Sequence, residues 1–221
     1  MFSEIAPRYD LRNRLLSFGA DLRWRRRAVD LALEKAPKRI LDLATGTGDL
    51  ALMLKERAPG AEVVGADFAP PMLAIARRKA EARGLEVRFL EADALALPFP
   101  DGAFDAVTIA FGIRNVPRID KALAEAHRVL KRGGRFLCLE FSHVDVPLLD
   151  KIYETYSFKV IPPMGRMVTG EAEPYQYLVE SIRKFPKPQA FANMIEDAGF
   201  RRAKFTPMTG GVVALHSGWK L

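Results

Sequence analysis

The strongest constraint on the fold is an alternation of strand-like and helix-like segments over residues 38–141. Residues 38–43 read as a short buried strand, and a glycine turn leads from them into a helical pattern at residues 50–54. Further strand patterns follow at residues 62–66, 86–91, 104–110 and 135–141. Helix patterns begin at Pro70 and at residue 119. This alternation predicts a doubly wound α/β fold, in which helices cover both faces of a parallel sheet.

The rhythm breaks after residue 141. Residues 147–195 look largely helical, and strand patterns return at residues 200–205 and 212–216. The turn Thr209-Gly210-Gly211 between these two strands predicts a terminal hairpin. We therefore expect a mostly parallel seven-stranded sheet with an antiparallel C-terminal strand, and a helical insertion before the last two strands.

Length and composition narrow the class of protein. A chain of 221 residues predicts a single domain over residues 1–221, and 49% apolar with 28% charged residues excludes a disordered or collagen-like chain. The longest apolar run, residues 106–113, is far shorter than the ~20 residues that span a bilayer. The first residues show no secretion signal, so we expect a cytoplasmic protein. One cysteine excludes an internal disulfide, and three histidines predict no metal site.

The net charge of +7 is concentrated near the N-terminus, where residues 8–27 hold seven arginines against two aspartates. One interpretation is a solvated helix face. The other is a basic patch that contacts an anionic membrane surface, which would place the protein peripherally on the inner face of the plasma membrane. The arginines that we expect to make this contact are Arg23, Arg25, Arg26 and Arg27.

A glycine turn, Gly46-Thr47-Gly48, follows the first predicted strand. Backbone N–H groups point outward at such a turn, and glycine lets a ligand approach the main chain, so the segment predicts an anion or nucleotide site. Together with Ala51, the same residues match the dinucleotide pattern G-x-G-x-x-G/A. The turn alone therefore leaves an NAD-dependent oxidoreductase open.

Two aspartates follow the next two predicted strands. Asp67 ends the second strand, where a carboxylate can accept hydrogen bonds from both hydroxyls of a ribose; an ordinary helix cap is the alternative. Asp93 follows the third strand, where it can accept from an adenine amino group beside the apolar Phe68 and Ala94. The pattern predicts a nucleoside site at the carboxyl ends of three adjacent strands.

This series of strand ends resembles the S-adenosyl-L-methionine site of the Rossmann-like methyltransferases. Asp42 occupies the acidic position of that family's first motif, and Ala44 stands where many members carry glycine. Because a methyl group is a small intrusion, we expect a slightly adjusted turn at Ala44. The resemblance implies a Rossmann-like fold with S-adenosylmethionine as the cofactor, and it implies no metal.

Longer segments resemble the ubiquinone/menaquinone biosynthesis C-methyltransferases over nearly the whole chain. The most diagnostic is Phe-Gly-Ile-Arg-Asn-Val at residues 111–116; others lie at residues 2–10, 175–182 and 210–218. The resemblance implies methylation of a prenylated demethylmenaquinol, with the related ubiquinone-pathway benzoquinol (2-methoxy-6-polyprenyl-benzoquinol) as the alternative. A different small-molecule methyltransferase or an RNA methyltransferase also stays open. The chain lacks an Asn/Asp-Pro-Pro-Tyr segment and an aromatic basic platform, so we expect no nucleic-acid partner.

The residue patterns and the resemblance together suggest roles for individual residues; the contacts of Thr47, Asp67, Asp93 and Ala94 are those that the resemblance implies. Cofactor contacts are expected from Asp42, Gly46, Thr47, Gly48, Asp67, Phe68, Asp93, Ala94 and Ala110. Some relatives have a serine at position 110, so the hydrogen bond that this serine would make is expected to be lost. Substrate contacts are expected from Tyr9, Phe111, Asn115 and Tyr156, although Asn115 is equally suited to capping a loop.

Transfer of a methyl group to a quinol ring needs a phenolate, because loss of the hydroxyl proton drives charge into the ring. Arg114 is the first candidate to stabilise it; the alternative is that Arg114 anchors its loop to carbonyls or to Glu140. His143 is a candidate base, or else an exposed loop histidine, and Tyr175 is a candidate donor to a quinol oxygen. His127 and His216 we interpret as structural.

Two regions are expected to serve the substrate. Residues 1–35 are predicted to form an N-terminal helical lid. Residues 145–195 carry apolar side chains at helical spacing. This second region is interpreted as a cover for the sheet, as a groove for an isoprenoid tail or as a homodimer interface.

Overall fold

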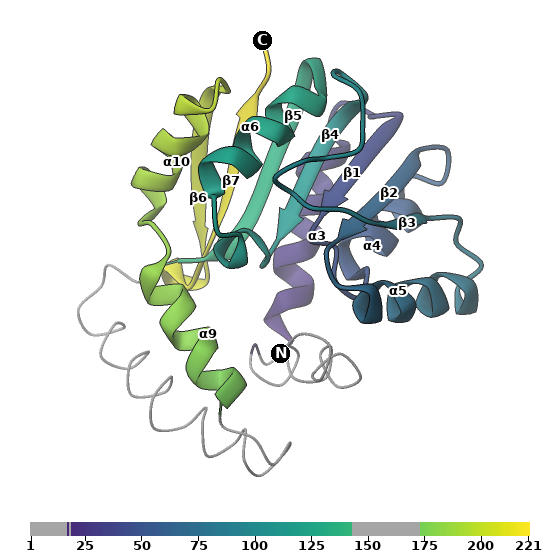
Figure 1. Ribbon diagram of the computed structural model, residues 1–221, viewed down its shortest axis with the longest axis horizontal. Coiled ribbons are helices and arrows are strands. Elements are labelled where there is room, and N and C mark those ends of the chain that lie inside the picture. The colour runs from purple at the N-terminus through teal and green to yellow at the C-terminus, as the bar shows by residue number, and fades with distance from the viewer. Residues whose placement is uncertain (1–16, 18, 143–172) are drawn as a thin grey trace.

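The fold is built on one seven-stranded sheet with the order β3-β2-β1-β4-β5-β7-β6 (Figure 1). The computed structural model describes residue 17 and residues 19–142 and 173–221. Its strands are β1 (Arg39–Leu43), β2 (Glu62–Asp67), β3 (Arg88–Glu91), β4 (Phe104–Ala110), β5 (Leu130–Phe141), β6 (Arg201–Met208) and β7 (Val213–Trp219). This is the predicted mostly parallel α/β sheet.

Strands β1 to β5 pair in parallel, and β7 pairs antiparallel with both β5 and β6. The predicted terminal hairpin is therefore confirmed, with its turn in the short 3₁₀ helix η4 (Thr209–Gly211). β5 begins at Leu130, five residues before the predicted start at residue 135, because Leu130 pairs with Phe104 ahead of a register shift.

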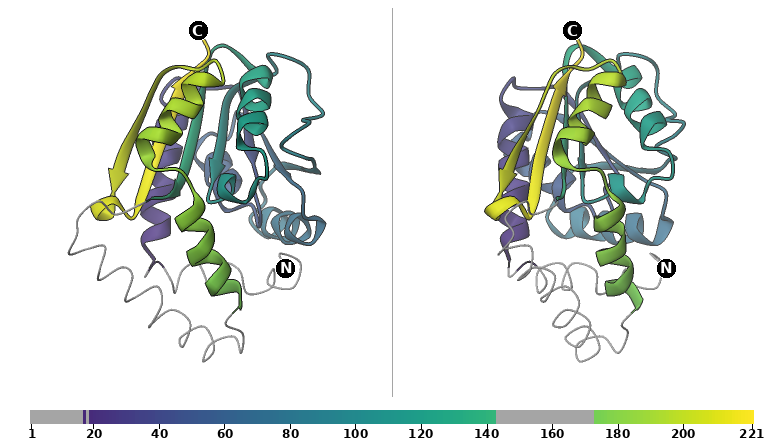
Figure 2. Two further views of the ribbon diagram at one scale, coloured as in Figure 1. Left: turned by 60° about the vertical axis from the view of Figure 1, so that its left-hand side comes forward. Right: turned by 90° about the vertical axis from the view of Figure 1, so that its left-hand side faces the viewer.

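Helices cover both faces of the sheet. They are α3 (Ala20–Leu33), α4 (Asp49–Arg57), α5 (Pro70–Ala82), α6 (Ile119–Val129), α9 (Glu173–Lys184) and α10 (Pro188–Asp197). Figure 2 shows α3 on one side of the sheet and α6 with α10 on the other. In the described part of the chain, no helix is long and apolar enough to span a membrane.

The buried side chains form one cluster on each face of the sheet. Ile40 of β1 joins the cluster with α3, α4 and α5, whereas its neighbour Leu41 joins the cluster with α6 and α10. This alternation follows from the two-residue period of a strand. Asp42 and Thr108 thus face the same side as Ile40, and their pairing in neighbouring strands places them together.

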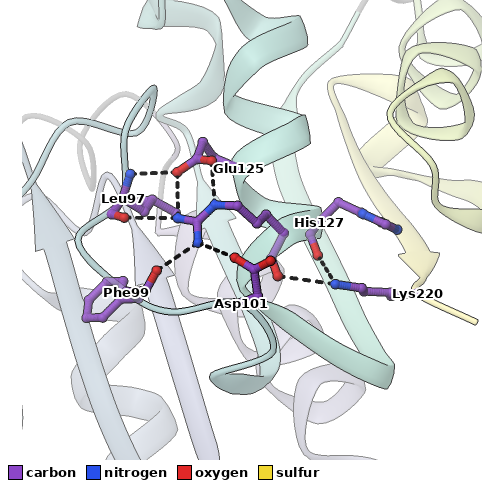
Figure 3. Close-up of polar contacts among 7 residues, drawn as sticks. Leu97, Phe99, Asp101, Glu125, His127 and Lys220 are labelled. Carbon is purple, nitrogen blue, oxygen red and sulfur yellow. Dashed lines mark hydrogen bonds and ion pairs between the residues drawn. The ribbon is translucent and has the colours of Figure 1, made fainter.

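An arginine of α6 fixes the irregular connection between β3 and β4 (Figure 3). Arg128 donates to the carbonyl oxygens of Leu97 and Phe99 at 3.0 and 2.8 Å, and it pairs with Asp101 and Glu125. Glu125 in turn accepts from the Leu97 N–H at 2.7 Å. These carboxylates hold the pKa of Arg128 above its ordinary value. The connection that starts at Asp93 is therefore tied to a helix of the core.

Two predicted regions are covered only in part. Of the predicted lid, α3 packs on the sheet, while residues 1–16 and 18 lie outside the described residues. Of the region 145–195, α9 and α10 are helical as predicted, while residues 143–172 are outside the described residues. The roles of these regions in binding substrate or a second copy stay predictions.

Candidate active site

A cavity of about 430 Å³ opens at the carboxyl ends of β1, β2, β3 and β4. The cavity lies beside β1. Strands β2 and β3 follow on one side of β1, and β4 and β5 follow on the other, and open α/β sheets bind ligands where the strand order changes direction in this way. Most of the predicted binding residues line it, namely Asp42, Gly46, Thr47, Asp67, Phe68, Asp93, Ala94, Ala110, Phe111 and Asn115. The chain order therefore brings the predicted residues to one place.

The turn between β1 and α4 adopts left-handed backbone at Ala44, Gly46 and Gly48, with φ of 48°, 57° and 82°. Gly48 was predicted to contact the cofactor, but it does not line the cavity. A Cβ there would lie 2.9 Å from the Cβ of Ala76 on α5. Glycine at this position is therefore explained by its backbone conformation and by helix packing.

Ala44 adopts a left-handed backbone in this turn, and space is left for its methyl group. The neighbour that leaves this space is Gly112, where an added Cβ would lie only 2.5 Å from the Ala44 Cβ. The Phe-Gly-Ile-Arg-Asn-Val segment and the glycine turn are thus matched in shape.

Asp42 fixes the base of the cavity. Its two carboxylate oxygens accept from the hydroxyls of Thr45 at 2.6 Å and Thr108 at 2.7 Å. Burial raises the pKa of Asp42 to about 6, and the two hydroxyl hydrogen bonds oppose that shift. Asp42 therefore connects the turn to β4, and both of its oxygens are already engaged in hydrogen bonds.

Asp67 connects the glycine turn to β2. One oxygen accepts from the Gly46 N–H at 2.8 Å and the other from the Ala69 N–H at 2.9 Å. Burial raises the pKa of Asp67, and the backbone hydrogen bonds oppose the rise. Because each carboxylate oxygen has further lone pairs, Asp67 can still accept from ligand hydroxyls in the cavity.

The third strand end combines a carboxylate with an exposed ring. Asp93 accepts from the Leu95 N–H at 2.9 Å, which leaves its second oxygen without a hydrogen bond to a described residue. Phe68 is 74% exposed at the rim, an unusual position for a large aromatic side chain. Ala94 and Leu95 also line this part of the cavity, so a planar base can pack here against apolar atoms.

Arg114 lies in the short 3₁₀ helix η2 (Ile113–Asn115) and does not line the cavity. Its guanidinium donates to Glu140 at 2.7 Å and to the Phe111 carbonyl oxygen at 2.6 Å. Burial raises the pKa of the wholly enclosed Glu140, and Arg114 opposes that rise. The anchoring interpretation of Arg114 is confirmed, whereas stabilisation of a phenolate stays a prediction.

The other predicted substrate and catalytic residues divide into two groups. Phe111 and Asn115 line the cavity, and the Asn115 side-chain oxygen accepts from the Tyr177 hydroxyl at 3.0 Å. The remaining candidates, whose side chains lie outside the described residues, are Tyr9, His143, Tyr156 and Tyr175. Only the position of Tyr175 in α9 is described.

The sequence analysis missed Arg25. The predicted surface patch included this residue, yet Arg25 is only 6% exposed and lines the cavity. The other three arginines of the patch are exposed and do not line the cavity; they are Arg23, Arg26 and Arg27. The signal was available in the helical spacing, because Arg25 shares the buried stripe of α3 with Asp21 and Val29. The charge block concealed it.

Both structural histidines are confirmed as packed groups. His127 is half-buried, with its ring 4.9 Å from that of Phe200. His216 is buried on β7, and burial lowers its pKa to about 4. Neither lines the cavity.

Relatives of known name share the sequence along the whole chain. Demethylmenaquinone methyltransferase of Thermus thermophilus is 69% identical over 99% of both chains. The ubiquinone/menaquinone biosynthesis C-methyltransferase UbiE of Bradyrhizobium diazoefficiens is 56% identical over 100% of this chain and 90% of its own.

Solved structures share the fold. A SAM-dependent methyltransferase from Thermotoga maritima superposes with a TM-score of 0.66 at 20% identity, covering 100% of this chain and 98% of its own. One from Aquifex aeolicus gives 0.61 at 18% identity, over 83% and 82% of the two chains. The sequence model of the ubiE/COQ5 methyltransferase family matches residues 1–220. The chain therefore belongs to the ubiE/COQ5 methyltransferase family.

Proposed function

We propose that this methyltransferase converts a prenylated demethylmenaquinol to the menaquinol, with S-adenosylmethionine as methyl donor. The observation that carries the proposal is that three adjacent strand ends bring Gly46, Asp67 and Asp93 to the same cavity. The named activity of the 69% identical Thermus relative supports the choice of substrate. The ubiquinone-pathway benzoquinol is the alternative, supported by the name of the Bradyrhizobium relative.

The described residues fit the cofactor. The cavity of about 430 Å³ is within the range of about 300–1,000 Å³ typical of ligand pockets. Asp67 would accept from the ribose hydroxyls while holding the Gly46 turn, and Asp93 would accept from the adenine amino group. Phe68, Ala94 and Leu95 would contact the base.

S-adenosylmethionine supplies a methyl group made electrophilic by its own sulfonium charge. The protein's main contribution is to align the methyl group with the ring carbon, which can supply at best ~7–11 kcal/mol. Phe111 and Asn115 would contact the quinol ring. The guanidinium carbon of Arg25 lies 5.1 Å from the centre of the Phe111 ring, and the Tyr177 hydroxyl donates to Asn115, so both side chains are held in place.

The proton of the quinol hydroxyl needs an acceptor. Asp42 is enclosed, with both oxygens bonded, so it is poorly placed for this task. The proposed groups for proton removal or for binding the quinol oxygen are therefore His143, Tyr9 and Tyr175, with Tyr156 toward the prenyl tail. Peripheral contact with an anionic membrane through Arg23, Arg26 and Arg27, and a homodimer, also remain proposals.

A turnover assay tests the proposed function. Purified protein is incubated with S-adenosylmethionine and either demethylmenaquinol or the ubiquinone-pathway benzoquinol, and the masses of the products are measured by mass spectrometry. We expect a methyl gain on the demethylmenaquinol at a rate well above that on the benzoquinol. Faster methylation of the benzoquinol would transfer the assignment to the alternative substrate. Binding of NADH without binding of S-adenosylhomocysteine would contradict the assigned cofactor.

A further inference from the structure

The charged side chains that line the cavity, among the described residues, are acidic apart from one. Four carboxylates line it, those of Asp42, Asp49, Asp67 and Asp93, and Arg25 is the one cationic lining residue among the described ones. Asp49 is neutralised by an ion pair with Lys79. A ligand in this cavity therefore meets acceptor oxygens at Asp67 and Asp93 and a lining cation at Arg25.

Arg25 is held rigidly at that place. One guanidinium nitrogen, Nη1, donates to Asp21 at 2.8 Å, and the guanidinium carbon lies 5.1 Å from the centre of the Phe111 ring. No described residue accepts a hydrogen bond from Nε or Nη2, and neither atom is sealed from the open space. Because these two donors are accessible on a side chain that lines the cavity, a ligand acceptor can bind beside them.

The position of Arg25 fixes one end of the ligand. Phe111 follows β4, whereas Asp93 and Phe68 follow β3 and β2 on the far side of β1. Adenine and ribose are assigned to the β2–β3 side, so the amino-acid part of the cofactor extends toward β4. Its carboxylate would be repelled by the aspartates elsewhere in the cavity and attracted to Arg25, the one cationic side chain among the described lining residues.

We propose that Arg25 binds the α-carboxylate of the methionine part of S-adenosylmethionine, and so selects ligands that carry this group. The assignment rests on the proposed function, since it takes S-adenosylmethionine as the ligand. The guanidinium is a suitable donor because it is always charged and presents its N–H groups in a fork that matches a carboxylate. The alternative is that Arg25 only joins α3 to Phe111.

The two roles are separated by deleting one group on each side of the contact. The affinities of S-adenosylmethionine and of decarboxylated S-adenosylmethionine, which lacks only the carboxylate, are measured by calorimetry without quinol. The proteins are the wild type, Arg25→Met, Arg25→Lys and the matched control Arg26→Met, which removes a neighbouring exposed arginine of the same helix. Thermal unfolding checks that each variant is folded.

We expect Arg25→Met to weaken S-adenosylmethionine binding about 30-fold while changing the affinity of the decarboxylated ligand less than about twofold. Arg25→Lys keeps the charge and serves if Arg25→Met does not fold. It should bind S-adenosylmethionine about fivefold more weakly than the wild type and should bind the decarboxylated ligand with unchanged affinity. Arg26→Met should bind both ligands as the wild type does.

Equal weakening of the two ligands by Arg25→Met or Arg25→Lys would overturn the assignment and leave the proposed function standing. Equal affinity of the wild type for the two ligands would do the same. Absence of S-adenosylmethionine binding by the wild type would overturn the proposed function and this assignment with it.

Discussion

The two halves of the cavity edge are held in different ways. On the β1–β2 side, Asp67 is bonded to backbone N–H groups of Gly46 and Ala69 and keeps lone pairs that face the cavity. On the β4–β5 side, the charges of Arg114 and Glu140 are bonded to each other and to the loop that contains Phe111. Similar charged residues near one site are thus placed differently: the carboxylate of Asp67 lines the cavity, whereas the charges of Arg114 and Glu140 are engaged with each other and with the loop.

The largest expected effect follows from breaking the second half. Arg114→Met leaves the Glu140 carboxylate enclosed without its cation, which should lower the free energy of unfolding by about 3–5 kcal/mol in urea titrations. The affinity for S-adenosylhomocysteine should change little. The control Arg118→Met breaks an exposed pair with Asp120 and should leave the stability close to that of the wild type. Unchanged stability with lost cofactor affinity would reverse the comparison.

Breaking the first half should act on the ligand. Asp67→Ala removes the acceptor for the ribose and for two backbone N–H groups, so calorimetry should show about 100-fold weaker binding of S-adenosylhomocysteine. Asp197 is an exposed aspartate at the end of α10, so Asp197→Ala serves as the matched control and should bind normally. An Asp67 variant with wild-type affinity would remove the ribose assignment.

Unfolding measured at a series of pH values tests whether Asp42 also serves to hold the structure. Burial raises its pKa from 3.8 to about 6 in the folded protein, so the folded state binds the proton more tightly than the unfolded state. Its contribution to stability is present below pH 3.8 and is lost as the pH rises through 6. Relative to Asp42→Asn, the wild type should therefore lose about 2 kcal/mol of unfolding free energy between about pH 4 and pH 7. A constant difference between the two proteins would show that Asp42 titrates normally.

The smallest effect tests the contact between the halves. Gly112→Ala places a methyl group against the Ala44 Cβ, which should cost about 1–2 kcal/mol by urea unfolding. Ala44→Gly in the same chain should restore most of that loss, because it removes the opposing methyl group. Additive effects of the two substitutions would mean that the turn and the Phe-Gly-Ile-Arg-Asn-Val segment pack independently.

The sequence pattern predicted the bounds of the buried strand β4 and the residues at the carboxyl ends of β2 and β3. The strand at residues 104–110 has the predicted bounds because its near-continuous apolar run is largely buried between the helices on both faces of the sheet. Asp67 and Asp93 reach one cavity because parallel strands end at one edge of the sheet. The dual use of Asp67, as support for the turn and as a cavity acceptor, needs the register of β1 against β2.

Other features depend on contacts that no local pattern contains. The early start of β5 follows from the pairing of Leu130 with Phe104, ahead of the register shift that leads to the pairing of Ala106 with Arg135. The burial of Arg25 depends on Phe111, which is remote in sequence. A block of arginines looks uniform along the chain, and only packing separates the enclosed member from the exposed ones.

The antiparallel course of β7 has a practical consequence for handling the enzyme. β7 runs away from the edge that holds the cavity, so Leu221 emerges at the opposite end of the sheet, where it is exposed (Figure 1). A purification tag or fusion partner joined after Leu221 would extend away from the cofactor opening. Immobilised by that end on a bead or a sensor chip, the protein would present its cavity outward to the flowing ligand.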